Sequence, residues 1–128
     1  MKLKYSNLMT IPLEGNSDIL DKQDHANIGR KFLRGTEYVH EFEVEARTLT
    51  SILNDAKAPD RIDFMSLDVE GGELEVLGGL DHRVYRFNWI LVESRSPEAL
   101  TRYMQSFGYD LDSQLTAHDY LYYDASGR

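Results

Sequence analysis

The stretch IDFMSLDVEGGELEVLGGL, Ile62–Leu80, constrains the fold more than any other part of the sequence. It opens with a short apolar run of the kind that forms a buried strand, and it closes with apolar residues at helical spacing. Between these two parts stand Asp68, Glu70 and a pair of glycines. The pattern predicts a strand over 62–69 that turns at once into a helix and carries carboxylates at its carboxyl end.

A second apolar run, WILVES at 89–94, suits a strand buried on both faces of a parallel sheet, as does 62–69. With the helix between them, the two runs predict a strand–helix–strand unit with a right-handed crossover. Another helix is predicted over 96–107, because a Ser-Pro pair opens this segment and Gly108 follows it. The terminal runs YDLDSQL and DYLYYD predict an antiparallel strand pair at the sheet edge.

The N-terminal part of the chain is less regular. Residues 41–46 alternate glutamate with apolar residues, which predicts a half-exposed strand. The following segment TLTSILNDAKAPD predicts a short amphipathic helix with Thr48 as its N-cap. Residues 1–35 show no sustained period, so we interpret them as an irregular segment with at most one short helix, and 36–128 as an α/β domain.

Composition narrows the class of protein. At 128 residues with 41% apolar residues, the chain has the size of one domain. A formal charge of −8 repels phosphate backbones and anionic lipid, so we expect no nucleic-acid or membrane partner. The absence of cysteine excludes disulfides and thiolate catalysis. No apolar run approaches the ~20 residues of a membrane span and no signal peptide is evident, so we expect a soluble cytoplasmic protein.

The carboxylates at the strand ends are the candidate chemical site. Asp68 and Glu93 each end a predicted parallel strand, and open α/β sheets bind their ligands outside these ends. Glu70 would stand on the loop beside Asp68, and Gly71 and Gly72 would let a ligand approach the backbone where the helix begins.

Two other interpretations of these residues stay open. Acidic residues before a helix also stabilise its N-terminus, which could explain Asp68 and Glu70, and Glu73 equally. A hard cation such as Mg²⁺ could bind Asp68, Glu70 and Glu93, because oxygen ligands suit it. The four histidines lack H-x-H or H-x-x-x-H spacing, so we predict no zinc site.

The blocks IDFMSLDVEGGELEVLGGL, WILVES and GYDLDSQLTAHDYLYYD together resemble the C-terminal part of the FkbM-type S-adenosylmethionine-dependent methyltransferases. That family's signature runs from an apolar strand through D-V-E-G to a helix opening on E-x-x-x-L. The similarity extends from about VEARTLTSIL to the end, roughly two-thirds of the chain. It departs from the usual pattern at Gly72, where Ala or Ser is common, and at Gly78, where a Lys often stands.

The resemblance implies a Rossmann-like class I methyltransferase fold with a mainly parallel sheet, S-adenosylmethionine as cofactor, and O-methylation of a sugar or natural-product hydroxyl. Asp68, Glu70 and Glu93 are then the catalytic candidates. Asp68 would position or deprotonate the hydroxyl, while Glu70 and Glu93 would shape the pocket. Asp68 and Gly71 are also the candidate contacts to the cofactor, with Mg²⁺ as an optional addition.

Two features of that fold are not found in the sequence, namely a glycine-rich turn after a first strand and an acidic residue ending a second. DHANIGRK imitates part of such a turn, but His25 stands where a glycine belongs. We therefore expect 36–128 to be the C-terminal part of a methyltransferase-like domain that lacks its first strands. Such a chain need not be active alone. In the resembled fold the first strand pairs with the strand at 62–69, whose edge would be exposed without it. Three explanations stay open: the chain is a fragment, two copies meet through this edge, or the N-terminal third supplies a substitute strand.

The sequence leans towards an enzyme but leaves two other classes open. One is a non-catalytic α/β module that serves dimerisation or interaction. The other is a carboxylate- and Mg²⁺-dependent hydrolase. The sequence does not fix the substrate, the oligomeric state, or whether the chain is a fragment that binds cofactor by itself.

Overall fold

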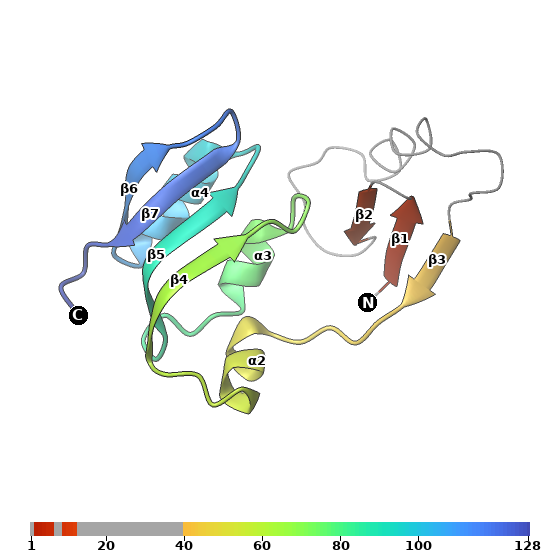
Figure 1. Ribbon diagram of the computed structural model, residues 1–128, viewed down its shortest axis with the longest axis horizontal. Coiled ribbons are helices and arrows are strands. Elements are labelled where there is room, and N and C mark those ends of the chain that lie inside the picture. The colour runs from red at the N-terminus through yellow and green to blue at the C-terminus, as the bar shows by residue number, and fades with distance from the viewer. Residues whose placement is uncertain (1, 7–8, 13–39) are drawn as a thin grey trace.

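The computed structural model describes residues 2–6, 9–12 and 40–128, with side chains from residue 43 onward. Figure 1 shows the elements in these ranges, which are β1 (Lys2–Ser6), β2 (Met9–Pro12), β3 (His40–Glu43), α2 (Leu49–Asp55), β4 (Arg61–Leu67), α3 (Glu73–Gly78), β5 (Arg86–Glu93), α4 (Pro97–Ser106), β6 (Tyr109–Gln114) and β7 (Asp119–Asp124). The strands form a three-stranded sheet of order β2-β1-β3 and a four-stranded sheet of order β4-β5-β7-β6.

The small sheet differs from the sequence prediction for the N-terminus. β1 pairs antiparallel with β2 and with β3, so two strands lie in a stretch that was predicted to be irregular. The segment KLKYS is only five residues long, which is too short for its pattern to predict a strand. Its pairing with β3 joins residues that are far apart in the sequence. The strand predicted at 41–46 is present but ends at Glu43. The remainder of 1–35 lies outside the described residues.

The large sheet confirms the strand–helix–strand unit. β4 pairs with β5 in parallel, and α3 makes the connection between them. β6 and β7 form the expected antiparallel pair, but β7 inserts between β5 and β6. The sheet is therefore partly parallel, because β7 lies beside β5 and runs in the opposite direction.

One face of the large sheet carries the core. Figure 1 shows α3 and α4 on the same side of the strands. Leu77 of α3 and Leu100 and Met104 of α4 are buried against Ile90 and Val92 of β5. Among the residues with described side chains, the buried cluster consists of Leu67, Leu77, Leu80, Tyr85, Phe87, Ile90, Val92, Leu100, Met104, Tyr109, Tyr120 and Tyr122.

The opposite face stays open in the described part of the chain. Phe64 of β4 is 52% exposed, and Trp89 of β5 is 41% exposed. The expectation that both strands are buried on two faces was therefore wrong, since α3 and α4 cover one side only. No helix among the described residues is long and apolar enough to cross a lipid bilayer.

The helix ends follow the sequence signals. The Thr48 side chain accepts a hydrogen bond from the Ser51 backbone N–H and caps α2, as predicted. The Thr50 hydroxyl donates to the carbonyl of Gly79, which docks α2 on the turn after α3. α4 begins at Pro97, and Gly108 after its end has a φ of 83°, a conformation that favours glycine.

A buried ion pair lies at the end of the large sheet where β5 begins. The side chains of Arg86 and Asp124 are only 7% and 5% exposed, and Arg86 Nε donates to Asp124 Oδ2 at 3.1 Å. The Arg86 guanidinium also donates to the carbonyl of Phe107 and lies 4.1 Å from the centre of the Tyr109 ring. Burial alone would raise the pKa of Asp124, but hydrogen bonds from Arg86 and Ser126 lower it below its usual range. This pair ties the start of β5 to the end of β7.

We predict that Asp124→Asn lowers the free energy of unfolding by about 3–5 kcal/mol, because it leaves a buried guanidinium without its counter-charge. Urea denaturation followed by circular dichroism measures the loss. The matched control is Asp112→Asn, at an exposed position of β6, for which we expect a change within about 0.5 kcal/mol. Equal effects of the two substitutions would show that the ion pair does not hold this end of the sheet.

Candidate functional site

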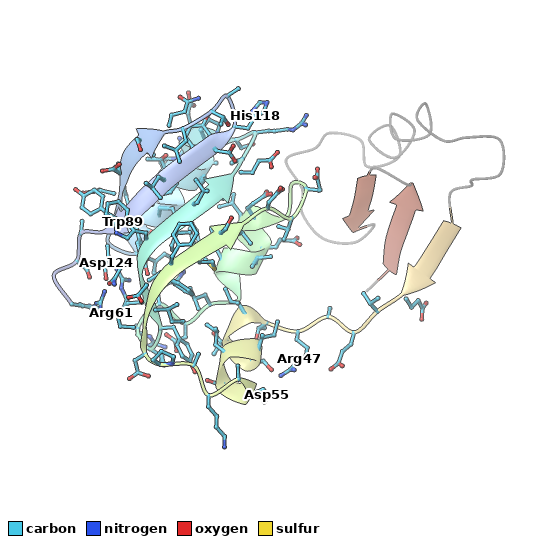
Figure 2. All side chains as sticks on the ribbon, in the orientation of Figure 1. Arg47, Asp55, Arg61, Trp89, His118 and Asp124 are labelled. Carbon is cyan, nitrogen blue, oxygen red and sulfur yellow. The ribbon has the colours of Figure 1, made fainter. Side chains whose placement is uncertain are left out.

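The carboxyl ends of β4 and β5 and the start of β7 lie at the same end of the strands of the large sheet. Asp68 directly follows β4, and Glu93 is the last residue of β5, the strand beside it. Because β7 runs antiparallel to β5, its first residue Asp119 lies opposite Glu93. His118, labelled in Figure 2, marks this end of the sheet. We call Asp68, Glu70, Glu93 and Asp119 the acidic rim.

The loop from β4 to α3 is held by a buried glutamate. Glu73 is only 4% exposed, and its Oε1 accepts hydrogen bonds from the backbone N–H groups of Val69 and Gly71, both at 3.2 Å. Glu70 and Gly71 between these contacts have φ values of 52° and 97°. Glu73 therefore has a structural role, because its carboxylate holds the backbone of the loop in place before α3.

A hydrogen bond between two carboxyl groups dominates the electrostatics of the acidic rim. The pKa of Glu93 is raised from 4.5 to about 7, first by its hydrogen bond to Asp68 and then by burial. The negative charges of Asp68, Glu70 and Asp119 add to the shift. Glu93 therefore gains and loses its proton near neutral pH, which suits a group that takes part in proton transfer.

The structure brings together the site residues predicted from the sequence. Asp68 and Glu93 share a hydrogen bond, Glu70 lies close enough for its charge to raise the pKa of Glu93, and Gly71 continues the same loop. Their roles in binding or catalysis are separate matters and belong to the proposal below.

The sequence analysis missed two residues at this end of the sheet. Asp119 adds a third negative charge beside Glu93, and the buried Ser94 has a backbone N–H that donates to the carbonyl of His118 at 2.8 Å. The Ser94 hydroxyl also accepts from the backbone N–H of Ser96, which fixes the turn into α4. The aspartate opening DYLYYD was a visible signal, but its position depends on β7 lying beside β5.

The structure gives no support to a metal site. Among the described residues, no group of three or more His, Cys, Asp or Glu side chains is arranged to hold a metal ion. His82 is buried, which lowers its pKa, and its ring stacks on Phe107 at 4.1 Å within the core.

Two cavities lie away from the acidic rim. One of about 580 Å³ lies between α2 and α3 and is lined by apolar side chains that include Leu49, Ile52 and Val76. The other, of about 230 Å³, adjoins His82 and Arg86. No residue of the acidic rim lines either of them, so we do not connect these cavities with the carboxyl pair.

The fold and the acidic rim define an α/β protein with its polar site at the carboxyl ends of parallel strands, the usual ligand position in this class. Comparison with protein families is more specific, because residues 5–120 match the model described as the methyltransferase FkbM domain. The chain belongs to this family, which confirms the resemblance seen in the sequence and extends it towards the N-terminus. Neither the curated proteins nor the solved structures give a match.

The two glycines of the loop provide a test of its conformation. Gly71→Ala should lower the free energy of unfolding by about 1–2 kcal/mol, because its φ of 97° disfavours a side chain. Gly72→Ala should leave stability unchanged or raise it by about 0.4–1 kcal/mol, since its Cβ would lie 3.7 Å from Val69, an ordinary contact. Thermal unfolding of both variants measures the difference, and a reversed order would contradict the loop geometry.

The raised pKa of Glu93 predicts a pH dependence of stability. The folded chain binds this proton more tightly than the unfolded chain does. Its stabilising effect is therefore complete below pH 4.5 and is lost as the pH rises through about 7. Glu93→Gln keeps a neutral hydrogen-bond donor but cannot titrate, so the loss should be absent from this variant. Urea denaturation across this pH range measures it, and parallel pH profiles of the two proteins would contradict the raised pKa of Glu93.

Proposed function

We propose that this chain is the substrate side of an S-adenosylmethionine-dependent O-methyltransferase of class I, Rossmann-like architecture. Its acceptor would be a hydroxyl group of a sugar or another natural product. Membership of the FkbM methyltransferase family supports methyl transfer. The observation that carries the choice of oxygen as acceptor is the hydrogen-bonded pair of Asp68 and Glu93 at the strand ends, because a hydroxyl must lose a proton when it is methylated.

The residues of the acidic rim divide this work. When bound, the cofactor supplies an electrophilic methyl group. Asp68 accepts the proton of the acceptor hydroxyl, while Glu93 in its protonated form holds Asp68 in position through their hydrogen bond. Glu70 supplies a further wall of the pocket, and its charge raises the pKa of Glu93.

The charge of the acidic rim also suits the cofactor. S-adenosylmethionine carries a positive sulfonium and a positive ammonium group, to which carboxylates are complementary. In this proposal Asp68 and Gly71 contact the cofactor. Gly71 has no Cβ and a positive φ, so no side chain on this residue would obstruct a ligand that approaches the loop after Asp68, which supports this assignment.

The other classes differ in what supports them. A non-catalytic interaction module is favoured by the exposed aromatic side chains of the open sheet face, and it predicts that Asp68→Asn and Glu93→Gln change no binding property. A Mg²⁺-dependent hydrolase lacks a corresponding observation, since the described residues contain no cluster of metal ligands.

The proposal includes a cytoplasmic location and a small-molecule acceptor, without a nucleic-acid or membrane partner. The formal charge of −8 and the absence of cysteine support this part.

We expect S-adenosylmethionine to bind the ¹⁵N-labelled chain weakly, with a dissociation constant of about 1 mM, because the acidic rim alone contacts only one end of the cofactor. Titration followed by nuclear magnetic resonance should shift the backbone signals of residues 68–72 and of Glu93. Asp68→Asn should weaken binding about tenfold or more, since it removes a charged acceptor. A parallel titration with Mg²⁺ tests the hydrolase.

Asp60→Asn is the matched control, because Asp60 is exposed and precedes β4 at the end of the strand opposite Asp68. This variant should bind as the unchanged chain does. Shifts confined to residues outside the acidic rim, or equal affinities of the Asp68 and Asp60 variants, would contradict the proposed site. Shifts at 68–72 with Mg²⁺ but not with the cofactor would favour the hydrolase.

A further inference from the structure

We propose that the cavity of about 230 Å³ beside His82 and Arg86 binds hydrogen phosphate, an anion that carries both negative charge and an O–H donor. This inference does not depend on the proposed enzymatic function. The cavity lies at the end of the large sheet where β5 begins, the end that Asp124 marks in Figure 2, whereas the acidic rim lies at the other end. All of its lining residues lie between His82 and Arg128, a stretch that the structure describes throughout.

The lining of this cavity is basic. It contains no aspartate or glutamate, and its polar members besides His82 are Arg83, Arg86, Arg128, Ser106 and Ser126. Guanidinium groups bind phosphate oxygens through charge-assisted hydrogen bonds. The volume lies below the ~300–1,000 Å³ of clefts that hold drug-sized ligands, so a small ion suits it better. The cavity therefore suits a small oxyanion, although the formal charge of the whole chain is −8.

The arginines differ in what they offer a ligand. The donors of Arg86 are already used by Asp124, by Ser126 and by two backbone carbonyls. The side chain of Arg83 is 86% exposed, and its contacts to Asp81 measure 3.3 Å and 3.5 Å. These distances are long for charge-assisted hydrogen bonds, and exposed ion pairs are weak. Arg83 can therefore exchange Asp81 for an anion in the cavity.

His82 supplies the observation that selects the ion. This residue is only 3% exposed, and it lines the cavity. Among the residues with described side chains, its Nδ1 is the one buried side-chain nitrogen or oxygen atom without a hydrogen-bond partner. Buried polar atoms nearly always have a partner, so this atom is available to a ligand.

The hydrogen bonds of the other ring nitrogen define the tautomer of His82. The Tyr103 hydroxyl donates its hydrogen to the carbonyl of Leu77 at 2.8 Å. The Nε2 atom lies 3.0 Å from the Tyr103 oxygen and 3.3 Å from the Leu77 oxygen, so Nε2 carries the hydrogen that binds them. Burial, as the main cause, lowers the pKa of His82, and the charge of Arg86 lowers it as well. The ring is therefore neutral at pH 7, with Nδ1 as a bare acceptor.

This acceptor distinguishes between anions of the same shape. Inorganic phosphate keeps at least one O–H group at neutral pH, and its other oxygens carry the negative charge. Sulfate is also tetrahedral but has no O–H group at this pH. In the proposed complex the phosphate O–H donates to His82 Nδ1, while the other oxygens accept from Arg83 and Arg128. The site should therefore prefer phosphate to sulfate.

Titration of the ¹⁵N-labelled chain at pH 7 and constant ionic strength tests the site. Inorganic phosphate should shift the backbone signals of residues 82–86, 106–108 and 126, with a dissociation constant of about 1 mM. Sulfate should bind about tenfold more weakly, because it would leave Nδ1 unpaired. Equal affinities for the two anions, phosphate shifts confined to other residues, or no binding would each overturn the proposal.

Arg83→Gln removes a guanidinium group that the proposed complex needs. It should weaken phosphate binding about tenfold, and its exposed position makes a folded variant the expected result. Arg95→Gln is the matched control, because Arg95 is exposed and follows β5 at the end of the acidic rim. This variant should bind phosphate as the unchanged chain does. Equal losses in the two variants would indicate a general effect of charge and would overturn the proposal.

The ring nitrogens of His82 give a readout that needs no variant. A long-range ¹H–¹⁵N correlation spectrum at pH 7 should show the tautomer with hydrogen on Nε2. The Nδ1 signal should move upfield when phosphate is added, because this atom accepts a hydrogen bond, and it should stay in place with sulfate. Hydrogen on Nδ1 in the free chain, or an Nδ1 signal that responds equally to both anions, would overturn the proposal.

Discussion

The acidic rim exists because β4 and β5 run in the same direction. Antiparallel strands would place Asp68 and Glu93 at opposite ends of the sheet. The connection through α3 allows the parallel arrangement, and Leu77 of α3 is buried in the same core cluster as Ile90 and Val92 of β5. The connection through the short helix α3 thus places Asp68 and Glu93 at the same end of the sheet.

The charged side chains at the two ends of the large sheet are arranged differently. At one end Arg86 and Asp124 are buried as a pair of opposite sign, and each reduces the cost of burying the other. At the other end, acidic residues of the same sign gather, and a proton on Glu93 relieves part of their repulsion. The first arrangement stabilises the fold. The second brings like charges together, and perturbed pKa values of this kind are common at functional sites.

The sequence predicted that Asp68 and Glu93 are neighbours, because its signals were local. The apolar runs ended at Asp68 and Glu93, and the helical spacing between them indicated a crossover, so the neighbouring positions of the two carboxylates followed from general rules for α/β sheets. Asp119 could not be found in this way. Its place depends on the order of strands, in which β7 inserts beside β5 and sets Asp119 opposite Glu93.

The amino-acid sequence by itself determined the helices, the strands of the large sheet, the loop glycines and the family, since these depend on contacts between near neighbours in the chain and on a contiguous motif. Tertiary structure alone decided which side chains of the large sheet are buried, how β1 is paired, and that the pKa of Glu93 is raised to about 7. Exposure, strand order and pKa depend on groups far apart in the sequence, which come together only when the chain has folded.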